Sequence, residues 1–332
     1  MSASDLAALA EATPGATSIT LAVLRNGQSE VFCHGHQSRT GQPTTPDTAY
    51  EMGSITKTFT ALLLARLTAH GDVDPRAPLN SYLPRELRLR GPGGDRVVPL
   101  HLATHTSGLP ALPPGLLRKA LPKLTTNPYL PYTEEDLARS VHRTRLTHPP
   151  GTHFRYSNYG AALLGRALAH TTRTPYARLL DERICRPLGL TATHCRSDRA
   201  QAVGYNSGRP MPPWQIPALP AAGALRSTGN DLLRYLRAHL EPDDTPLPSA
   251  LRAVQEAQLR LPRSGKQLCL MWYRHQVDGR SVFSHSGATR GFTTFIGFAP
   301  RSRTAFAALA NTNASRATGF LQHAYTLLHT NA

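Results

Sequence analysis

Cysteine is scarce in this chain, and its scarcity argues against metal chemistry. The 332 residues include four cysteines, Cys33, Cys185, Cys195 and Cys269. They form no Cys-x-x-Cys pair and share no spacing with histidine that is typical of a zinc site. We therefore expect inert thiols, no bound metal and no cofactor.

Long apolar runs and targeting signals are also lacking. No stretch approaches the roughly 18 apolar residues of a membrane span, so we expect no membrane partner. The first residues, MSASDLAALAEATPG, lack the basic and apolar regions of a signal peptide. The sequence therefore predicts a cytoplasmic protein. It leaves the oligomeric state open.

Acidic residues are few: 21, against 37 basic residues, give a formal net charge of +16. The basic residues are scattered, and their densest group, Arg85, Arg88, Arg90 and Arg96, is interrupted by apolar and acidic positions. Because a nucleic-acid surface needs a coherent basic stripe or a recognition motif, we expect no nucleic-acid partner. Anionic substrates or carriers would still be attracted.

The hydrophobic pattern changes character twice along the chain. Residues 16–35 predict two strands around the turn Asn26-Gly27, a strong hairpin signal. From about residue 72 to 260 the chain is typical of helices joined by Pro- and Gly-rich loops, with a long loop expected over 105–132. After about residue 267 short β-like runs return. The helices that we expect are 4–12, 54–70, 133–144, 158–171, 175–185, 228–240 and 315–329. Strands at both ends predict one sheet built from both termini, with a helical insertion.

The stretch YEMGSITKTFTALLLARL, residues 50–67, carries a lysine in the first turn of its predicted helix. A cation is unfavourable there, because it faces the positive end of the helix dipole. Three residues apart on a helix, Ser54 and Lys57 share a face. A serine hydroxyl needs a base nearby, and burial and the helix terminus both lower the pKa of a lysine. This spacing predicts a nucleophile, Ser54, and its base, Lys57.

Two further motifs follow in order: Tyr156-Ser157-Asn158 and His285-Ser286-Gly287. Ser-x-x-Lys is a serine acyl-transfer signature of β-lactamases and penicillin-binding proteins. With the segments HLATHTSGLP, RPLGLTATH and AAGALRSTGNDLLRYL, the three motifs resemble the serine β-lactamase-related family over about residues 20–312. That family includes class C β-lactamases, D-alanyl-D-alanine carboxypeptidases and aminopeptidases, family VIII esterases and related transacylases.

The resemblance implies the β-lactamase/penicillin-binding-protein transpeptidase-like fold, of α/β plus all-α class. An antiparallel sheet built from both chain ends would form an α/β domain of residues 1–53 and 261–332. Residues 54–260 would form a mainly helical domain, with the active site in the cleft between the two.

The resemblance also implies residue roles. Tyr156 is similar to the family's second general acid/base, and Asn158 to the residue that hydrogen-bonds the lysine and the acyl side of the substrate. The backbone N–H groups of Ser54 and Ala288 would form the oxyanion hole. Gly287, after Ser286, would let the substrate approach the strand closely.

At one position the sequence departs from the family. Lactamases and carboxypeptidases usually have lysine where this chain has His285, next to the substrate carboxylate. Because histidine is mostly neutral at pH 7, it is a weaker anion partner. This difference favours substrates without that carboxylate, and Arg290 remains a candidate for a positive charge.

Competing sites are poor. Gly-x-Ser-x-Gly is absent, which disfavours an α/β-hydrolase elbow. His101 and His105 flank Ser107-Gly108, and we expect both to be structural.

We predict a serine acyl-transfer enzyme that forms an acyl-enzyme on Ser54 from a small-molecule donor. The acyl group would pass to an amine or alcohol, as in a transacylase of small-metabolite or antibiotic biosynthesis, or to water, as in an esterase or amidase. The alternatives are a β-lactamase or D-Ala-D-Ala carboxypeptidase or aminopeptidase and, in another class, a non-catalytic binding or sensor protein on the same fold.

Overall fold

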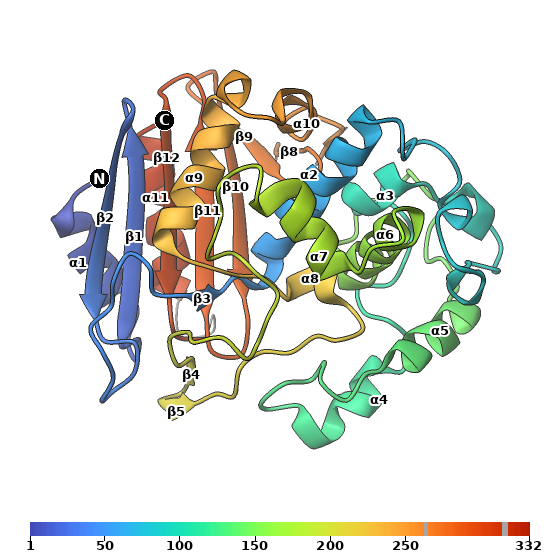
Figure 1. Ribbon diagram of the computed structural model, residues 1–332, viewed down its shortest axis with the longest axis horizontal. Coiled ribbons are helices and arrows are strands. Elements are labelled where there is room, and N and C mark those ends of the chain that lie inside the picture. The colour runs from blue at the N-terminus through green and yellow to red at the C-terminus, as the bar shows by residue number, and fades with distance from the viewer. Residues whose placement is uncertain (262–264, 314–317) are drawn as a thin grey trace.

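The computed structural model describes residues 1–261, 265–313 and 318–332 (Figure 1). Within them, eight strands form one sheet in the order β2-β1-β12-β11-β10-β9-β8-β7. Every neighbouring pair is antiparallel, and β1 pairs with β12 from the other end of the chain. The predicted antiparallel sheet from both termini is confirmed. Its strands are β1 Ser18–Arg25, β2 Gln28–Gly35, β7 Leu259–Arg260, β8 Gln267–Leu268, β9 Tyr273–Val277, β10 Arg280–Ala288, β11 Thr293–Ala299 and β12 Thr304–Ala310.

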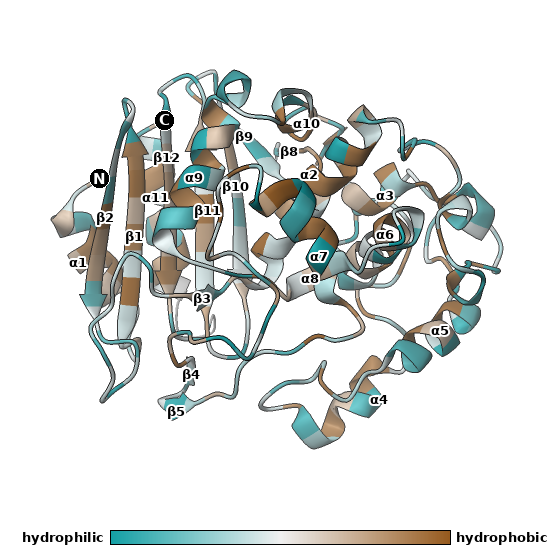
Figure 2. Cartoon of the chain, in the orientation of Figure 1, coloured by the Kyte–Doolittle hydropathy of each residue, from teal (hydrophilic) through white to brown (hydrophobic). Residues whose placement is uncertain are grey.

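Helices cover both faces of this sheet (Figure 1). Alternate residues of β1 point to opposite faces, so Leu21 and Val23 join one apolar cluster, and Ala22 and Leu24 the other. Helices α1 (Ala3–Glu11) and α11 (Thr318–Thr330) cover the first face, and α9 (Gly229–Leu240) covers the second. Figure 2 shows the brown, apolar strands between these helices.

The rest of the chain surrounds helix α2, Thr56–Ala69. Nearly all its side chains are buried, because α6, α8 and α10 pack around it. The other helices here are α3 Pro99–Ala103, α4 Leu116–Ala120, α5 Glu134–Arg143, α6 Asn158–Thr171, α7 Tyr176–Leu180, the π-helical turn η6 Asp181–Cys185, α8 Pro220–Gly223 and α10 Pro248–Ala253. Short strands complete it: β3 Tyr50–Glu51 pairs with β6 Arg226–Ser227, and β4 Tyr205–Asn206 with β5 Arg209–Pro210. No helix of the described residues is long and apolar enough to cross a bilayer.

Two details differ from the expectations. The segment 105–132, expected to be a loop, contains α4 and the 3-10 turn η5, Leu121–Lys123. The helix-forming run Leu-Leu-Arg-Lys-Ala lies between Pro114-Gly115 and Pro122, which set its limits. Helix α9 lies within the predicted helical domain but packs on the sheet. The predicted division at residue 260, between a helical domain and an α/β domain, therefore stays a prediction.

Candidate active site

Ser54 lies in the 3-10 turn η1, Gly53–Ile55, which leads directly into α2. Gly53 has a positive φ of 49°. A Cβ at this glycine would lie 2.7 Å from the backbone N of Ala288, so the turn is in close contact with the end of β10. The glycine therefore permits both the backbone conformation and the approach that bring Ser54 next to Ala288.

Lys57 points from the first turn of α2 toward the serine. Its Nζ lies 3.0 Å from Ser54 Oγ and donates to the Ala222 carbonyl at 2.7 Å. The side chain is fully buried, and no ion pair of the described residues involves it. Burial lowers the pKa of Lys57 to about 7, because the ammonium loses its hydration without gaining a counter-charge. A substantial neutral fraction at neutral pH makes this amine able to take the serine proton.

Tyr156 lies beside the same pair. Its ring centroid is 5.0 Å from Lys57 Nζ, and its hydroxyl lies near the Ser54 side chain. Burial raises the pKa of Tyr156, and the contact with Ser54 offsets only part of that effect. The phenol therefore keeps its proton at neutral pH and is available as a donor.

Asn158 begins α6 and lines the pocket, but it does not show the predicted contact with Lys57. Its Nδ2 donates to the Tyr129 hydroxyl at 2.9 Å. Its Oδ1 is buried and has no hydrogen-bond partner among the described residues. The predicted contact with the acyl side of a substrate stays a prediction.

The third motif places its side chains on two faces of β10. The His285 Nδ1–H donates to the Ser286 carbonyl at 2.7 Å, and burial and nearby Lys57 lower the pKa of His285 to about 3. This ring is therefore neutral. The Ser286 side chain instead interacts with Tyr325 of α11, on the far face of the sheet. The structure does not bring the Ser286 hydroxyl into the pocket.

Gly287 has a packing reason to be glycine, and the predicted close approach of substrate stays a prediction. A Cβ there would collide with the Met52 carbonyl, which comes from the segment just before Ser54. The close approach is thus made by the protein's own chain, and Thr294 Oγ1 donates to the same carbonyl at 3.1 Å. This packing holds the turn η1 against β10.

A pocket of about 320 Å³ opens beside Ser54. Arg290 lies at this pocket, and its guanidinium donates to the Leu124 carbonyl at 2.6 Å. Tyr129 and Trp214, which sequence reasoning did not single out, pack edge to face with ring centroids 5.4 Å apart. Both come from Pro-rich stretches that carry no periodic signal. The lining residues are Gly53, Ser54, Pro128, Tyr129, Asn158, Trp214, Ile216, Ala222, Gly223, Ala288, Thr289, Arg290 and Asn313.

The two histidines that were expected to be structural differ in position. His101 is half-buried, and its Nδ1 accepts from the Val98 N–H at 3.3 Å. His105 is buried beside Tyr156, with ring centroids 4.5 Å apart, and accepts from the Ser157 N–H at 3.3 Å. Burial keeps the pKa of His105 well below its usual value, so this neighbour of the site is neutral.

Comparisons with known proteins agree with this geometry. A family model described as Beta-lactamase matches residues 6–330. A beta-lactamase of Providencia stuartii is 26% identical over 91% of this chain and 83% of its own length. The D-alanyl-D-alanine-carboxypeptidase/endopeptidase AmpH of Escherichia coli K12 is 28% identical over 86% of this chain and 77% of its own. The solved beta-lactamase/D-alanine carboxypeptidase from Pseudomonas syringae superposes with a TM-score of 0.81 at 24% identity, covering 97% of this chain and 98% of that one, which shows the shared fold.

Proposed function

The chain belongs to the Beta-lactamase family of serine hydrolases, and we propose that it forms an acyl-enzyme on Ser54 from a neutral ester or amide. The observation that carries the proposal is the amine of Lys57, buried without a carboxylate and 3.0 Å from Ser54 Oγ. A non-catalytic binding protein would have no use for a buried, unpaired amine at that position.

The proposed reaction uses only side chains and backbone groups already in place. Neutral Lys57 accepts the Ser54 proton as Oγ attacks the donor carbonyl. The backbone N–H groups of Ser54 and Ala288 stabilise the oxyanion. As the carbon–heteroatom bond breaks, the Tyr156 phenol protonates the leaving group and regains a proton from Lys57. The acceptor then loses its proton by the reverse route as it takes the acyl group.

The surroundings of the serine support a neutral donor. His285, which stands where the family usually has a lysine, is buried and neutral. The pocket wall includes Tyr129, Trp214 and Ile216, which suit an apolar acyl group. We propose transfer to an amine or alcohol of a small metabolite, with hydrolysis as the competing outcome when water enters.

A second candidate is a β-lactamase or D-Ala peptidase, because the relatives that match most of the chain carry those names. The two candidates differ in the charge of the donor. A substrate carboxylate gains about 1.5–3 kcal/mol from a charged hydrogen bond, and neutral His285 does not supply one.

Labelling the serine tests the proposed function. A fluorophosphonate followed by peptide mapping should place the adduct on Ser54, and Ser54→Ala should abolish it. Ser4→Ala, at an exposed position of α1, is the matched control and should label normally. The second-order acylation rate for a neutral ester should exceed that for a penicillin. A faster rate with penicillin would favour the second candidate, and labelling elsewhere would overturn the mechanism.

A further inference from the structure

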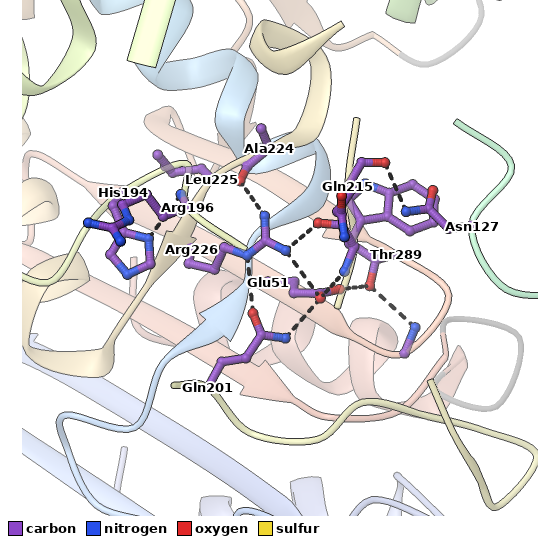
Figure 3. A network of polar contacts seen from close by, with 12 residues as sticks. Glu51, Asn127, His194, Arg196, Gln201, Gln215, Ala224, Leu225, Arg226 and Thr289 are labelled. Atoms are coloured by element: carbon purple, nitrogen blue, oxygen red, sulfur yellow. Dashed lines mark hydrogen bonds and ion pairs between the residues drawn. The ribbon is translucent and has the colours of Figure 1, made fainter. Parts of the chain in front are cut away.

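A buried ionic network lies behind the pocket. Glu51 ends β3, three residues before Ser54, and is paired with Arg226 of β6. Arg226 Nη2 and Glu51 Oε1 are 3.6 Å apart, and the two side chains are only 1% and 4% exposed. Gln201 bridges them, accepting from Arg226 Nε at 3.1 Å and donating to Glu51 Oε1 at 2.9 Å (Figure 3). Such a pair is strongly coupled, because water does not screen it.

The network holds the backbone of Trp214 from both sides. The Trp214 N–H donates to Glu51 Oε1 at 2.6 Å, and its carbonyl accepts from Arg226 Nη2. Residues 211–216 form no helix or strand, and Pro212 and Pro213 have no N–H to donate. The two charged groups therefore supply the anchorage that this loop lacks in regular structure.

The Glu51 carboxylate also contacts the residue that directly follows β10. Glu51 Oε2 accepts from Thr289 Oγ1 at 2.7 Å (Figure 3). Thr289 follows Ala288, the expected oxyanion donor. One side chain thus connects the nucleophile segment, the Trp214 loop and the end of β10.

Trp214 connects this network to the pocket beside Ser54. Its side chain is 8% exposed, lines the pocket with Ser54 and packs against Tyr129. A shift of its backbone would move the indole and change the room beside the serine.

We propose that Glu51 and Arg226 are positioning residues that fix Trp214, and so select acyl groups whose apolar side chain fits against Trp214 and Tyr129. This selection rests on the acyl-enzyme chemistry proposed for Ser54. The ion pair does not touch the acyl group; it acts through the indole.

Acyl-group selectivity tests the proposal. The measured quantity is the ratio of kcat/KM for p-nitrophenyl phenylacetate to that for p-nitrophenyl acetate. Trp214→Ala should lower this ratio about tenfold, mainly through KM. Glu51→Gln, nearly the same in shape, should lower it several-fold in the same direction. The double variant Glu51→Gln/Trp214→Ala should have the same ratio as Trp214→Ala alone. Arg226→Lys, which keeps the charge, should lower the ratio less than Glu51→Gln does.

A matched control separates positioning from loss of any buried charge. Asp231 is 1% exposed, and its carboxylate accepts from Thr193 Oγ1 at 2.7 Å and pairs with Arg234 at 2.9 Å. It does not contact Trp214. Asp231→Asn should leave the selectivity ratio within twofold of the original.

Fluorescence gives a readout that needs no Ser54 chemistry. The chain has two tryptophans, and Trp272 is fully buried, so acrylamide quenching reports chiefly on Trp214. The quenching constant should rise at least twofold in Glu51→Gln and remain unchanged in Asp231→Asn. An unchanged ratio and an unchanged quenching constant in folded Glu51→Gln would overturn the proposal. Failure of Ser54 to label, with increased quenching, would instead contradict the acyl-enzyme chemistry alone.

Discussion

Lys57 and Arg226 are both basic residues with almost no exposed surface, and both lie beside the segment that carries Ser54. Their surroundings differ. Lys57 Nζ meets two neutral oxygens, Ser54 Oγ and the Ala222 carbonyl, whereas Arg226 meets the Glu51 carboxylate. Burial lowers the pKa of each, but only Arg226 has an opposing negative charge.

One small region thus holds two buried basic side chains in different surroundings. A buried ammonium without a counter-ion gives up its proton readily. A guanidinium starts from so high a pKa that it stays charged, and its planar fork suits several fixed acceptors. Lys57 is therefore suited to moving a proton, and Arg226 to holding a loop.

Removing the lysine amine should have the largest effect on activity. Lys57→Met should lower kcat/KM about 10³-fold or more, roughly 4 kcal/mol, because it removes the proposed base of Ser54. The melting temperature should stay the same or rise, since a buried unpaired amine is unfavourable. Steady-state kinetics and thermal unfolding measure both, with Lys123→Met on the exposed turn η5 as the control.

The effect of removing the Tyr156 hydroxyl on activity should depend on whether the Lys57 amine is present. Adding Tyr156→Phe to Lys57→Met should cost much less than the product of the single effects, because linked catalytic residues are non-additive. Independent, multiplicative losses would make Tyr156 a structural residue.

The arginine should show the opposite balance of effects. Arg226→Met should lower the free energy of unfolding by about 3 kcal/mol, because it leaves Glu51 buried without its partner. Glu51→Gln/Arg226→Met should regain part of that loss. Urea denaturation measures the changes, and Arg252→Met, in an exposed pair with Asp243, should have a much smaller effect. Equal losses for Arg226→Met and Arg252→Met would show that the buried pair contributes no more to stability than the exposed pair.

The pH dependence of stability should also reflect the missing counter-charge at Lys57. The folded pKa of Lys57 is about 7 and lies below its usual value of 10.5. Between these values the unfolded chain binds a proton that the folded chain does not, so this group makes stability rise with pH, by at most about 1.4 kcal/mol per pH unit. The free energy of unfolding of the original protein should therefore rise relative to that of Lys57→Met from pH 7.5 to 8.5, which narrows any advantage of the variant. A relative fall of the original protein's stability over this range would contradict a neutral lysine.

The smallest effect is expected at His285. Asn has an Nδ2 able to replace the donor that the ring offers to the Ser286 carbonyl, so His285→Asn should change kcat/KM for a neutral ester by less than about threefold. Because the pKa of His285 is about 3, the pH–rate profile from pH 5 to 8 should keep its midpoint. A shifted midpoint would show that this ring titrates in the working enzyme.

Local signals predicted much of the fold. The Asn26-Gly27 turn has positive φ at both residues, 50° and 81°, as expected for its hairpin. Helix α6 has the predicted range, because the Ser157 hydroxyl caps it through the Gly160 N–H. Helix α4 was missed, since five helix-forming residues between prolines give no periodic signal.

The site was predictable where neighbours in sequence are neighbours in space. Ser54 and Lys57 lie one turn apart, so their contact follows from helix geometry. The connection of Glu51 to Trp214 spans 163 residues, and no local pattern indicates it. The sequence signal for a buried partner of Glu51 was its position between apolar Tyr50 and Met52, because a buried acidic residue requires a partner. The face of β10 that Ser286 occupies depends on strand register, which the motif alone does not specify.

The pairing of β1 with β12 affects how the chain can fold during its synthesis. Ser18 and Asn311, which hydrogen-bond at this seam, are 293 residues apart in the chain. During synthesis the first hairpin waits, with one edge unpaired, until almost the whole chain has left the ribosome. Contacts of such high sequence separation slow folding and prolong the exposure of apolar strands. Ser54 likewise meets Ala288 only after β10 has been made, so the two sides of the pocket come together late in synthesis.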